Sequence, residues 1–458
     1  MEKKGRVTDM TEGPVVRLIL WFAIPIFLGN LCQQLYNIVD VSVAGRYLGD
    51  SSLAALGAVG SIYSLLINFV WGFTNGFSIL VSRAFGNGKE EKVRDSVAQM
   101  ILLNAVLLVI VIVASVIGIR PLLHVLKTPS EIFEEAYTYM LVIILGLPAT
   151  VFYNMQASIL RALGNSKTPL VYLCIACAAN IVLDFLLVAG LKMGVDGLAI
   201  ATVTAQLISA VLCFIHICRH YRILYLKKEN FKIRKDEISE MFTTGLSMAL
   251  MYSIFSIGTV ILQGAINALG EATITAHFAA RKAMQIIQFP LVSISNANAT
   301  FVSQNYGASK PERVKEGVRK SCILTVCWAV IATGIVFGIA NWIIEMLTNT
   351  DSKEVLDLAT KYMYINVPFT TTLGVLITLR TSLQSIGRKI TPLISSGIEL
   401  GAKVVATWSL VPLTGYFGVC IIEPIIWVVC MVWLWISYRI AVKEELERGK
   451  IVHMTHEA

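Results

Sequence analysis

Two stretches of this chain resemble each other: residues 82–94 read SRAFGNGKEEKVR and residues 303–315 read SQNYGASKPERVK. They align at a shift of 221 residues, and the same shift aligns LGD at 48–50 with LGE at 269–271. Chance similarity between apolar helices would not preserve polar loop motifs in the same order. We therefore predict that the chain contains an internal repeat, in which the second half repeats the first.

The composition places both copies in a membrane. Of the 458 residues, 56% are hydrophobic and only 15% are charged, whereas soluble domains carry about 25% charged residues. A chain this apolar could not cover its surface with polar groups. Nucleic-acid binding is therefore excluded as its main role, despite the formal net charge of +8. The nine cysteines, an odd number mostly in apolar stretches, indicate no disulfide framework.

The apolar stretches on either side of the repeated loops predict the fold. A spanning helix needs about 20 mostly apolar residues, and at these lengths only helices satisfy their backbone groups in lipid. We predict an all-α membrane protein with twelve transmembrane helices, at roughly residues 16–45, 53–81, 96–118, 132–157, 169–190, 197–217, 241–267, 273–302, 321–345, 356–383, 392–413 and 417–440. Kinks are expected at the prolines inside them, which are Pro25, Pro148, Pro290, Pro368 and Pro424.

Six spans in each half make the halves parallel repeats, since an even number returns the chain to the same side. The predicted parts are an N-terminal lobe (1–217), a charged cytoplasmic linker (218–240), a C-terminal lobe (241–440) and a cytoplasmic tail (441–458). Two such lobes are expected to enclose a central cleft, which suits transport by alternating access.

The basic residues predict the orientation, because Lys and Arg concentrate in cytoplasmic loops. Three loops are rich in them, and the loops between these hold far fewer. The three loops contain Arg83, Lys89, Lys92 and Arg94; Arg219, Arg222, Lys227, Lys228, Lys232, Arg234 and Lys235; and Lys310, Arg313, Lys315, Arg319 and Lys320. Both termini are then cytoplasmic, and we expect a multi-pass protein of the cell membrane.

Polar groups inside the predicted spans are costly and usually functional. Asp40 lies eight residues before Leu48, Asp184 lies about 22 Å into its span, and Thr202 is close to the outer start of the next one. Asn180 is one turn from Asp184 on the same face. These four residues predict an oxygen-rich cluster that binds a small cation or shares a proton. The alternative is that they only hydrogen-bond one another and lock the lobe.

The second half does not copy this cluster. At a shift of 221, Asp40 aligns with Ile261 and Asp184 with Val405. Glu399 and Lys403 are an i, i+4 pair that we expect to neutralise each other. Further polar residues leave alternatives open: Arg281 and Lys282 either face water or pair with an acid across the cleft, and Glu423, which aligns with Thr202, either faces the cleft or does not.

The chain resembles the multidrug and toxic compound extrusion (MATE) family over residues 12–440. The resemblance rests on residues 25–45 (PIFLGNLCQQLYNIVDVSVAG), 161–169 (RALGNSKTP), 194–199 (GVDGLA) and 301–308 (FVSQNYGA). The major facilitator loop motif and a P-loop are not matched at residues 83–91. The resemblance is closer to the DinF-like and archaeal branch than to the NorM-like branch. NorM-like relatives have sodium-binding acids in the two spans that here include residues 241–267 and 363–383, and these residues contain no Asp or Glu.

The resemblance implies a secondary antiporter, not an enzyme, that exports organic, cationic and amphipathic compounds in exchange for H⁺ or Na⁺. It implies a coupling site at Asp40, Asn180, Asp184 and Thr202, with no cofactor and no metal other than Na⁺ there. The expected partners are small organic molecules and the lipid bilayer, with no nucleic acid or nucleotide, and the protein is expected to be a monomer. The remaining candidates are a hinge at Pro25 and the cleft residues Gln34, Tyr36, Asn37, Arg281, Met284 and Glu423. The alternative functions are a lipid-linked precursor flippase and a dedicated metabolite exporter on the same plan.

Overall fold

The computed structural model describes residues 8–348 and 352–456, and throughout these ranges the chain forms helices and no strand. The fold class is therefore all-α, as predicted. Residues 1–7 and the last two residues of the predicted tail lie outside the described ranges.

The helices of the first half are α1 (Val15–Val43), α2 (Asp50–Gly86), α3 (Glu90–Val125), α4 (Ser130–Ala162), α5 (Lys167–Asp184) and α6 (Val195–His220). Those of the second half are α7 (Lys235–Asn267), α8 (Glu271–Gly307), α9 (Pro311–Thr348), α10 (Lys353–Asn366), α11 (Thr370–Ser385), α12 (Ile390–Thr414) and α13 (Tyr416–His456). π-helical turns extend α1 (Ala44–Leu48) and α5 (Phe185–Gly190). Each predicted span falls within one helix and its extension, except 356–383, which is divided between α10 and α11.

Nine helices in the described part of the chain are long and apolar enough to cross a membrane, and the bent pair α10 and α11 would make a tenth. The helices α8 and α12 are not among them. Both carry charges inside the predicted span, Arg281 and Lys282 on α8 and Glu399 and Lys403 on α12. The twelve-helix plan is thus consistent with the structure, while hydropathy alone supports a smaller number of spans.

The predicted prolines differ in whether the helix ends at them. At Pro368 the chain breaks, and α10 and α11 meet at 52°. The other four prolines lie inside helices that continue through them. A non-helical backbone at Ile339 interrupts α9 instead, with no proline there. The missing N–H of a proline therefore does not by itself end these helices.

The helix boundaries reproduce the internal repeat. Both α2 and α8 have 37 residues and begin 221 residues apart, and α3 and α9 begin at the same shift. The shift is 223 for the starts of α4 and α10 and of α5 and α12, and it returns to 221 for α6 and α13. The turns before α2 and α8 use aligned glycines, Gly49 and Gly270, with φ of 84° and 99°, a region that favours glycine.

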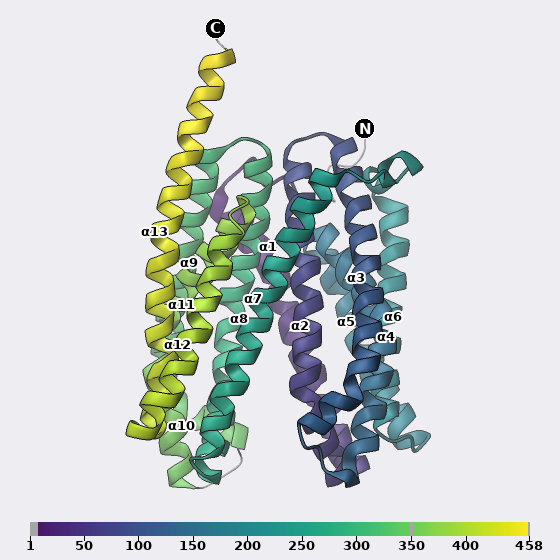
Figure 1. The fold of residues 1–458 in the computed structure, drawn as a ribbon, viewed down its shortest axis with the longest axis vertical. Coiled ribbons are helices and arrows are strands. Elements are labelled where there is room, and N and C mark those ends of the chain that lie inside the picture. The colour runs from purple at the N-terminus through teal and green to yellow at the C-terminus, as the bar shows by residue number, and fades with distance from the viewer. Residues whose placement is uncertain (1–7, 349–351, 457–458) are drawn as a thin grey trace. The chain divides into compact units, whose positions relative to one another are not determined.

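The chain divides into two compact units. Unit 1 comprises Met1–Asp9 and Leu28–Ala249, and unit 2 comprises Met10–Phe27 and Leu250–Ala458. In unit 1, α4 packs against α2, α3, α5 and α6; in unit 2, α11 packs against α8, α9, α12 and α13 (Figure 1). The chain passes from one unit to the other inside α1 and again inside α7.

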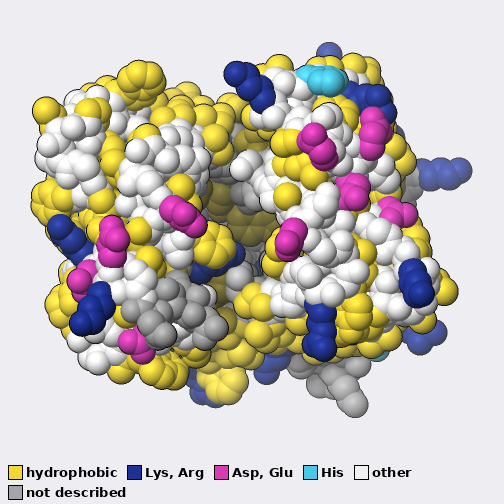
Figure 2. Space-filling view, turned by 90° about the horizontal axis from the view of Figure 1, so that it is seen from below, with side chains coloured by type: hydrophobic (Ala, Val, Ile, Leu, Met, Phe, Trp, Pro, Cys, Tyr) yellow, Lys and Arg dark blue, Asp and Glu magenta, His cyan; other side chains and the backbone are white. Residues whose placement is uncertain are grey.

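Large apolar side chains are exposed along the helices, as lipid contact requires. Examples are Ile117 on α3, Phe214 on α6, Trp342 on α9 and Trp408 on α12. Figure 2 shows the end of the molecule where α10 lies, with hydrophobic side chains along the flanks and charged side chains on the end face. This distribution is that of a protein that spans a membrane.

Candidate functional site

Both predicted carboxylates of unit 1 lie next to π-helical turns. Asp40 is in the last turn of α1, and Asp184 is the final residue of α5, directly before Phe185–Gly190. The two π turns contact each other, with the rings of Tyr47 and Phe185 packed edge to face at 6.2 Å. π turns are rare and often mark functional sites. No feature of the sequence had predicted them.

The structure brings the four predicted cluster residues together in unit 1. The carboxyl groups of Asp40 and Asp184 are close enough to interact. One turn before Asp184, the amide of Asn180 donates a long hydrogen bond of 3.5 Å to the Thr202 hydroxyl on α6. Asn180 and Asp184 are buried, whereas Asp40 and Thr202 are half-buried.

This cluster has an excess of hydrogen-bond acceptors. Four of its buried oxygen atoms have no hydrogen-bond partner: Oδ1 of Asp40, Oδ1 and Oδ2 of Asp184 and Oδ1 of Asn180. A fifth such oxygen, Oε1 of Gln206, is on α6 one turn from Thr202. An unsatisfied buried polar group costs about 1–3 kcal/mol. A proton or a small hard cation would satisfy these oxygens, because carboxylate and amide oxygens are suitable ligands for both.

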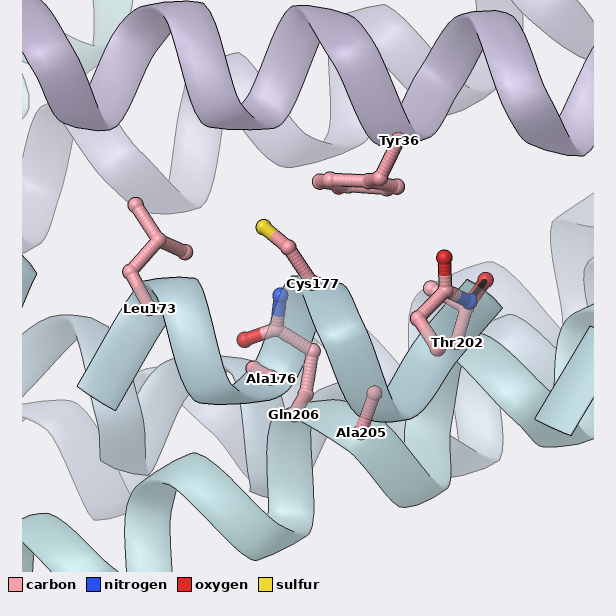
Figure 3. Close-up of a pocket in the computed structure, with 8 residues that line it drawn as sticks. Tyr36, Leu173, Ala176, Cys177, Thr202, Ala205 and Gln206 are labelled. Carbon is pink, nitrogen blue, oxygen red and sulfur yellow. Dashed lines mark hydrogen bonds between the residues drawn. The ribbon is translucent and has the colours of Figure 1, made fainter. Parts of the chain in front are cut away.

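A small pocket adjoins the cluster. The ring of Tyr36 extends from α1 toward α5, where Leu173 and Cys177 point back at it (Figure 3). The lining is completed by Ala176, Asn180, Thr202, Ala205 and Gln206. Asn180 and Thr202 thus belong both to the acceptor cluster and to the pocket wall, so a molecule in the pocket would touch the cluster.

The sequence had not singled out Gln206 as a site residue, and it had not predicted Cys177 in a pocket. Gln206 follows Thr202 by one helical turn on α6, a spacing that places both side chains on one face. Of the other cleft candidates in unit 1, Gln34 is half-buried and Asn37 is exposed. Pro25 lies inside α1, two residues before the chain leaves unit 2 for unit 1.

The cleft candidates of unit 2 are paired or packed. Arg281 donates from Nη1 to both carboxylate oxygens of Glu423, at 2.9 and 3.0 Å, and the Tyr362 hydroxyl donates to the same carboxylate at 3.0 Å. Of the alternatives open for Arg281, pairing with an acid is therefore the observed one, and the acid belongs to the same unit. Met284 is 2% exposed and lies in the hydrophobic core of unit 2.

Glu399 and Lys403 do pair, with 3.5 Å between Oε1 and Nζ, but not in isolation. Arg380 on α11 also contacts Glu399, with 3.2 Å between Nη2 and Oε2. Arg380 was not predicted as a site residue, although a charge inside span 356–383 was a sufficient signal. The single shift of 221 also aligned Asp184 with Val405. The helix starts, 223 residues apart, place Asp184 opposite Thr407 and Asn180 opposite Lys403.

Comparison with known proteins identifies the family that the sequence of this chain matches. The MatE family profile matches residues 25–186 and 243–408, which is more than half of the chain. The probable multidrug resistance protein YoeA of Bacillus subtilis is 24% identical over 369 residues, which cover 79% of each chain. The probable multidrug resistance protein YpnP of the same organism is 26% identical over 310 residues, covering 67% of this chain and 68% of YpnP.

Solved structures share the fold. One is described as the outward-facing conformation of a multidrug resistance MATE family transporter of the MOP superfamily. Its TM-score is 0.90 at 20% sequence identity, over 97% of this chain and 99% of that one. At that identity the likeness supports the fold alone.

Proposed function

Because the chain belongs to the MatE family of multidrug and toxic compound extrusion transporters, we propose that it is a secondary active antiporter. It exports organic compounds in exchange for H⁺ or Na⁺, and it is not an enzyme. The observation that carries this proposal is the group of five unpartnered acceptor oxygens in unit 1. Such a group binds a cation or proton strongly only while it is dry, and alternating access changes how wet it is.

The coupling site comprises Asp40, Asn180, Asp184 and Thr202. Asp40 is on α1 and Asp184 is on α5, so a bound ion holds these two helices together. Loss of the ion frees the outer part of α1 to move, with Pro25 as the hinge, since a proline leaves one backbone hydrogen bond unmade. The pocket behind Tyr36 shares Asn180 and Thr202 with the coupling site. Cargo and ion therefore compete for the same side chains.

The predicted arrangement of the membrane spans suits this function. Twelve spans form two six-helix lobes, 1–217 and 241–440, and residues 218–240 link them in the cytoplasm. The basic loops favour cytoplasmic termini in the cell membrane. The acid-free span 241–267 favours the DinF-like branch over the NorM-like one. We further propose a monomer, with cleft contacts from Gln34, Tyr36 and Asn37.

The flippase and dedicated-metabolite alternatives receive less support, since the two relatives described above are named as probable multidrug resistance proteins. An acidic site in unit 1 also suits cationic cargo better than a lipid phosphate.

The test is export of a fluorescent cation from proteoliposomes under an imposed pH gradient or, separately, a sodium gradient. We expect one gradient to drive export and Asp40→Asn to lose it. Asp50→Asn is the matched control, because Asp50 is an exposed carboxylate at the start of α2, outside the cluster. Full gradient-driven export by Asp40→Asn at wild-type protein levels would contradict the proposal.

A further inference from the structure

Five charged side chains of unit 2 form one continuous network. It runs from Arg380 on α11 through Glu399 and Lys403 on α12 to Glu423 on α13 and Arg281 on α8. The contact that joins α12 to α13 is the 3.6 Å contact between Nζ of Lys403 and Oε1 of Glu423. Four of the five side chains are at most 9% exposed, and Arg281, at 28%, is the accessible end.

The charges of this network do not balance. Three cations face two carboxylates, so the ionised network carries one excess positive charge. Buried charges are normally paired, because an unpaired ion loses its hydration without compensation. A network that only held the helices together would need no third cation.

The hydrogen bonds show the same imbalance. Three of the four carboxylate oxygens of Glu399 and Glu423 accept a hydrogen bond from a cation or a hydroxyl. The fourth, Oε1 of Glu399, faces Nζ of Lys403 at 3.5 Å, beyond the 2.7–2.9 Å typical of a charge-assisted hydrogen bond. Nζ of Lys403, which is 3.6 Å from Glu423, and Nε of Arg380 are buried donors with no hydrogen-bond partner. Donors without a hydrogen bond therefore outnumber acceptors without one in this network.

The internal repeat relates the contact of Lys403 with Glu423 to the pocket of unit 1. At the shifts set by the helix starts, Lys403 aligns with Asn180 and Glu423 with Thr202. The 3.6 Å contact in unit 2 is thus the counterpart of the 3.5 Å contact in the pocket of unit 1. On the neighbouring helix, Gly258 aligns with Asn37. A Cβ at Gly258 would lie 3.0 Å from Cδ of Lys403, so the absence of a side chain makes room for the lysine.

The surroundings of Lys403 strengthen its attraction for an anion. Its ammonium lies 4.8 Å from the ring centroid of Phe255, and Leu400 also lies beside Gly258. In such apolar surroundings an ion pair is worth more than in water.

We propose that this network, with Lys403 at its centre and Arg281 at its accessible end, binds the carboxylate of a transported organic compound. Substrates of this transporter would then include zwitterionic amphiphiles, not only simple cations. The proposal rests on the export function proposed above and adds a substrate class to it. No covalent chemistry is involved: the carboxylate accepts hydrogen bonds from the donors that lack partners.

A matched pair of dyes tests this. Rhodamine 110 carries a free carboxylate, and rhodamine 123 is its methyl ester, with the same fluorophore and cationic ring system. Binding of each to the purified full chain is measured by fluorescence anisotropy, at low and at high chloride concentration in a buffer that contains no carboxylate. We expect Lys403→Met to weaken binding of the acid by about tenfold or more, the scale of a charged hydrogen bond, with little effect on the ester.

A second variant distinguishes loss of the binding site from misfolding of the protein. Glu399→Gln removes a competing anion, while its amide oxygen still accepts from Arg380. We expect this variant to bind the acid several-fold more tightly than wild type does, a gain that damaged protein would not show. Lys403→Arg, which keeps the charge, is expected to retain most of the preference for the acid.

Three outcomes would overturn the proposal: equal loss of both dyes in Lys403→Met, no change in either, or chloride binding at Lys403 with no preference for the acid over the ester. The last would identify an inorganic anion site. Export of the ester under a gradient separates this test from the first one. Wild type that exports the ester yet binds both dyes alike refutes only the carboxylate site, whereas failure to export any cation refutes the antiporter.

Discussion

Units 1 and 2 are built from repeated helices but hold opposite polar groups at equivalent positions. In unit 1, the contact of Asn180 with Thr202 lies beside two carboxylates and leaves five acceptor oxygens unpartnered. In unit 2, the aligned contact of Lys403 with Glu423 lies in a network with one cation too many and two unpartnered donors. The helix lengths and turns of the repeat are preserved, whereas the polarity of the site is reversed.

The difference teaches that the scaffold and the site are under separate constraints. Helix length and the turns that need a positive φ fix the scaffold, and both repeats keep them, as at Gly49 and Gly270. The polar side chains at the repeat-equivalent positions are not needed for those features. They can therefore differ between the repeats without a change in the scaffold, as the proposed cation and carboxylate sites do.

The largest effect is expected at the acceptor site. Asp184→Asn should remove the influence of the coupling ion on dye affinity, which in coupled sites is typically about 5- to 150-fold. The reason is that the amide cannot take up a proton or neutralise a sodium ion. Binding of rhodamine 123 at low and high pH, with and without sodium, measures this. A variant whose affinity still responds to pH or sodium as wild type does would remove Asp184 from the coupling site.

The next effect concerns stability and should appear in the other unit. Glu423→Gln takes a counter-charge from Arg281 and Lys403, and breaking a buried pair costs about 3–5 kcal/mol. Asp184→Asn should cost much less, because neither oxygen of Asp184 has a hydrogen bond to lose. Reversible unfolding in detergent compares the two variants. Equal losses would mean that the networks have the same role.

A native cysteine pair tests whether α1 moves during export. The Sγ atoms of Cys32 on α1 and Cys174 on α5 are 3.4 Å apart, and both are free thiols. A disulfide needs an S–S distance of about 2.05 Å, so mild oxidation should join the two helices. We expect export to stop in the cross-linked fraction and to return on reduction. Cys174→Ser should be insensitive to the oxidant, and full export by cross-linked protein would exclude movement of α1 against α5.

The smallest effect is expected for an ion pair at the surface. Arg120 and Glu134 are 3.2 Å apart with side chains 53% and 69% exposed. Such pairs contribute about 0–1 kcal/mol. Arg120→Ala should therefore change the unfolding free energy by less than about 1 kcal/mol and leave dye binding intact. A larger loss would show that charge pairing outside the buried networks also holds the unit together.

The positions of the helices were largely predictable, since each predicted span falls on a helix or on the bent pair. Span length and loop motifs are local properties that one stretch of sequence displays. The candidate cluster was found for a related reason: Asp40 and Asp184 are conspicuous charges in apolar stretches. Arg380 had the same signal and was overlooked. Its partnership with Glu399 joins two helices, and no spacing along the chain encodes it.

The residue-by-residue alignment of the two halves was likewise only partly predictable from the sequence. A single shift of 221 from the loop motifs placed Val405 opposite Asp184, and only the helix starts revealed the shift of 223 in this region. The π turns beside both carboxylates were also beyond prediction, since they arise where packing accommodates an extra residue in a turn.

By itself the sequence determined that this is an all-helical membrane protein with an internal repeat. The reason is that the length of the apolar stretches and the polar loops between them decide which segments can cross a bilayer. Tertiary structure alone decided which polar atoms meet. That matters because a buried charge is defined by its partners: the surplus acceptors of unit 1 and the surplus donors of unit 2 exist only once helices distant in the chain are packed together.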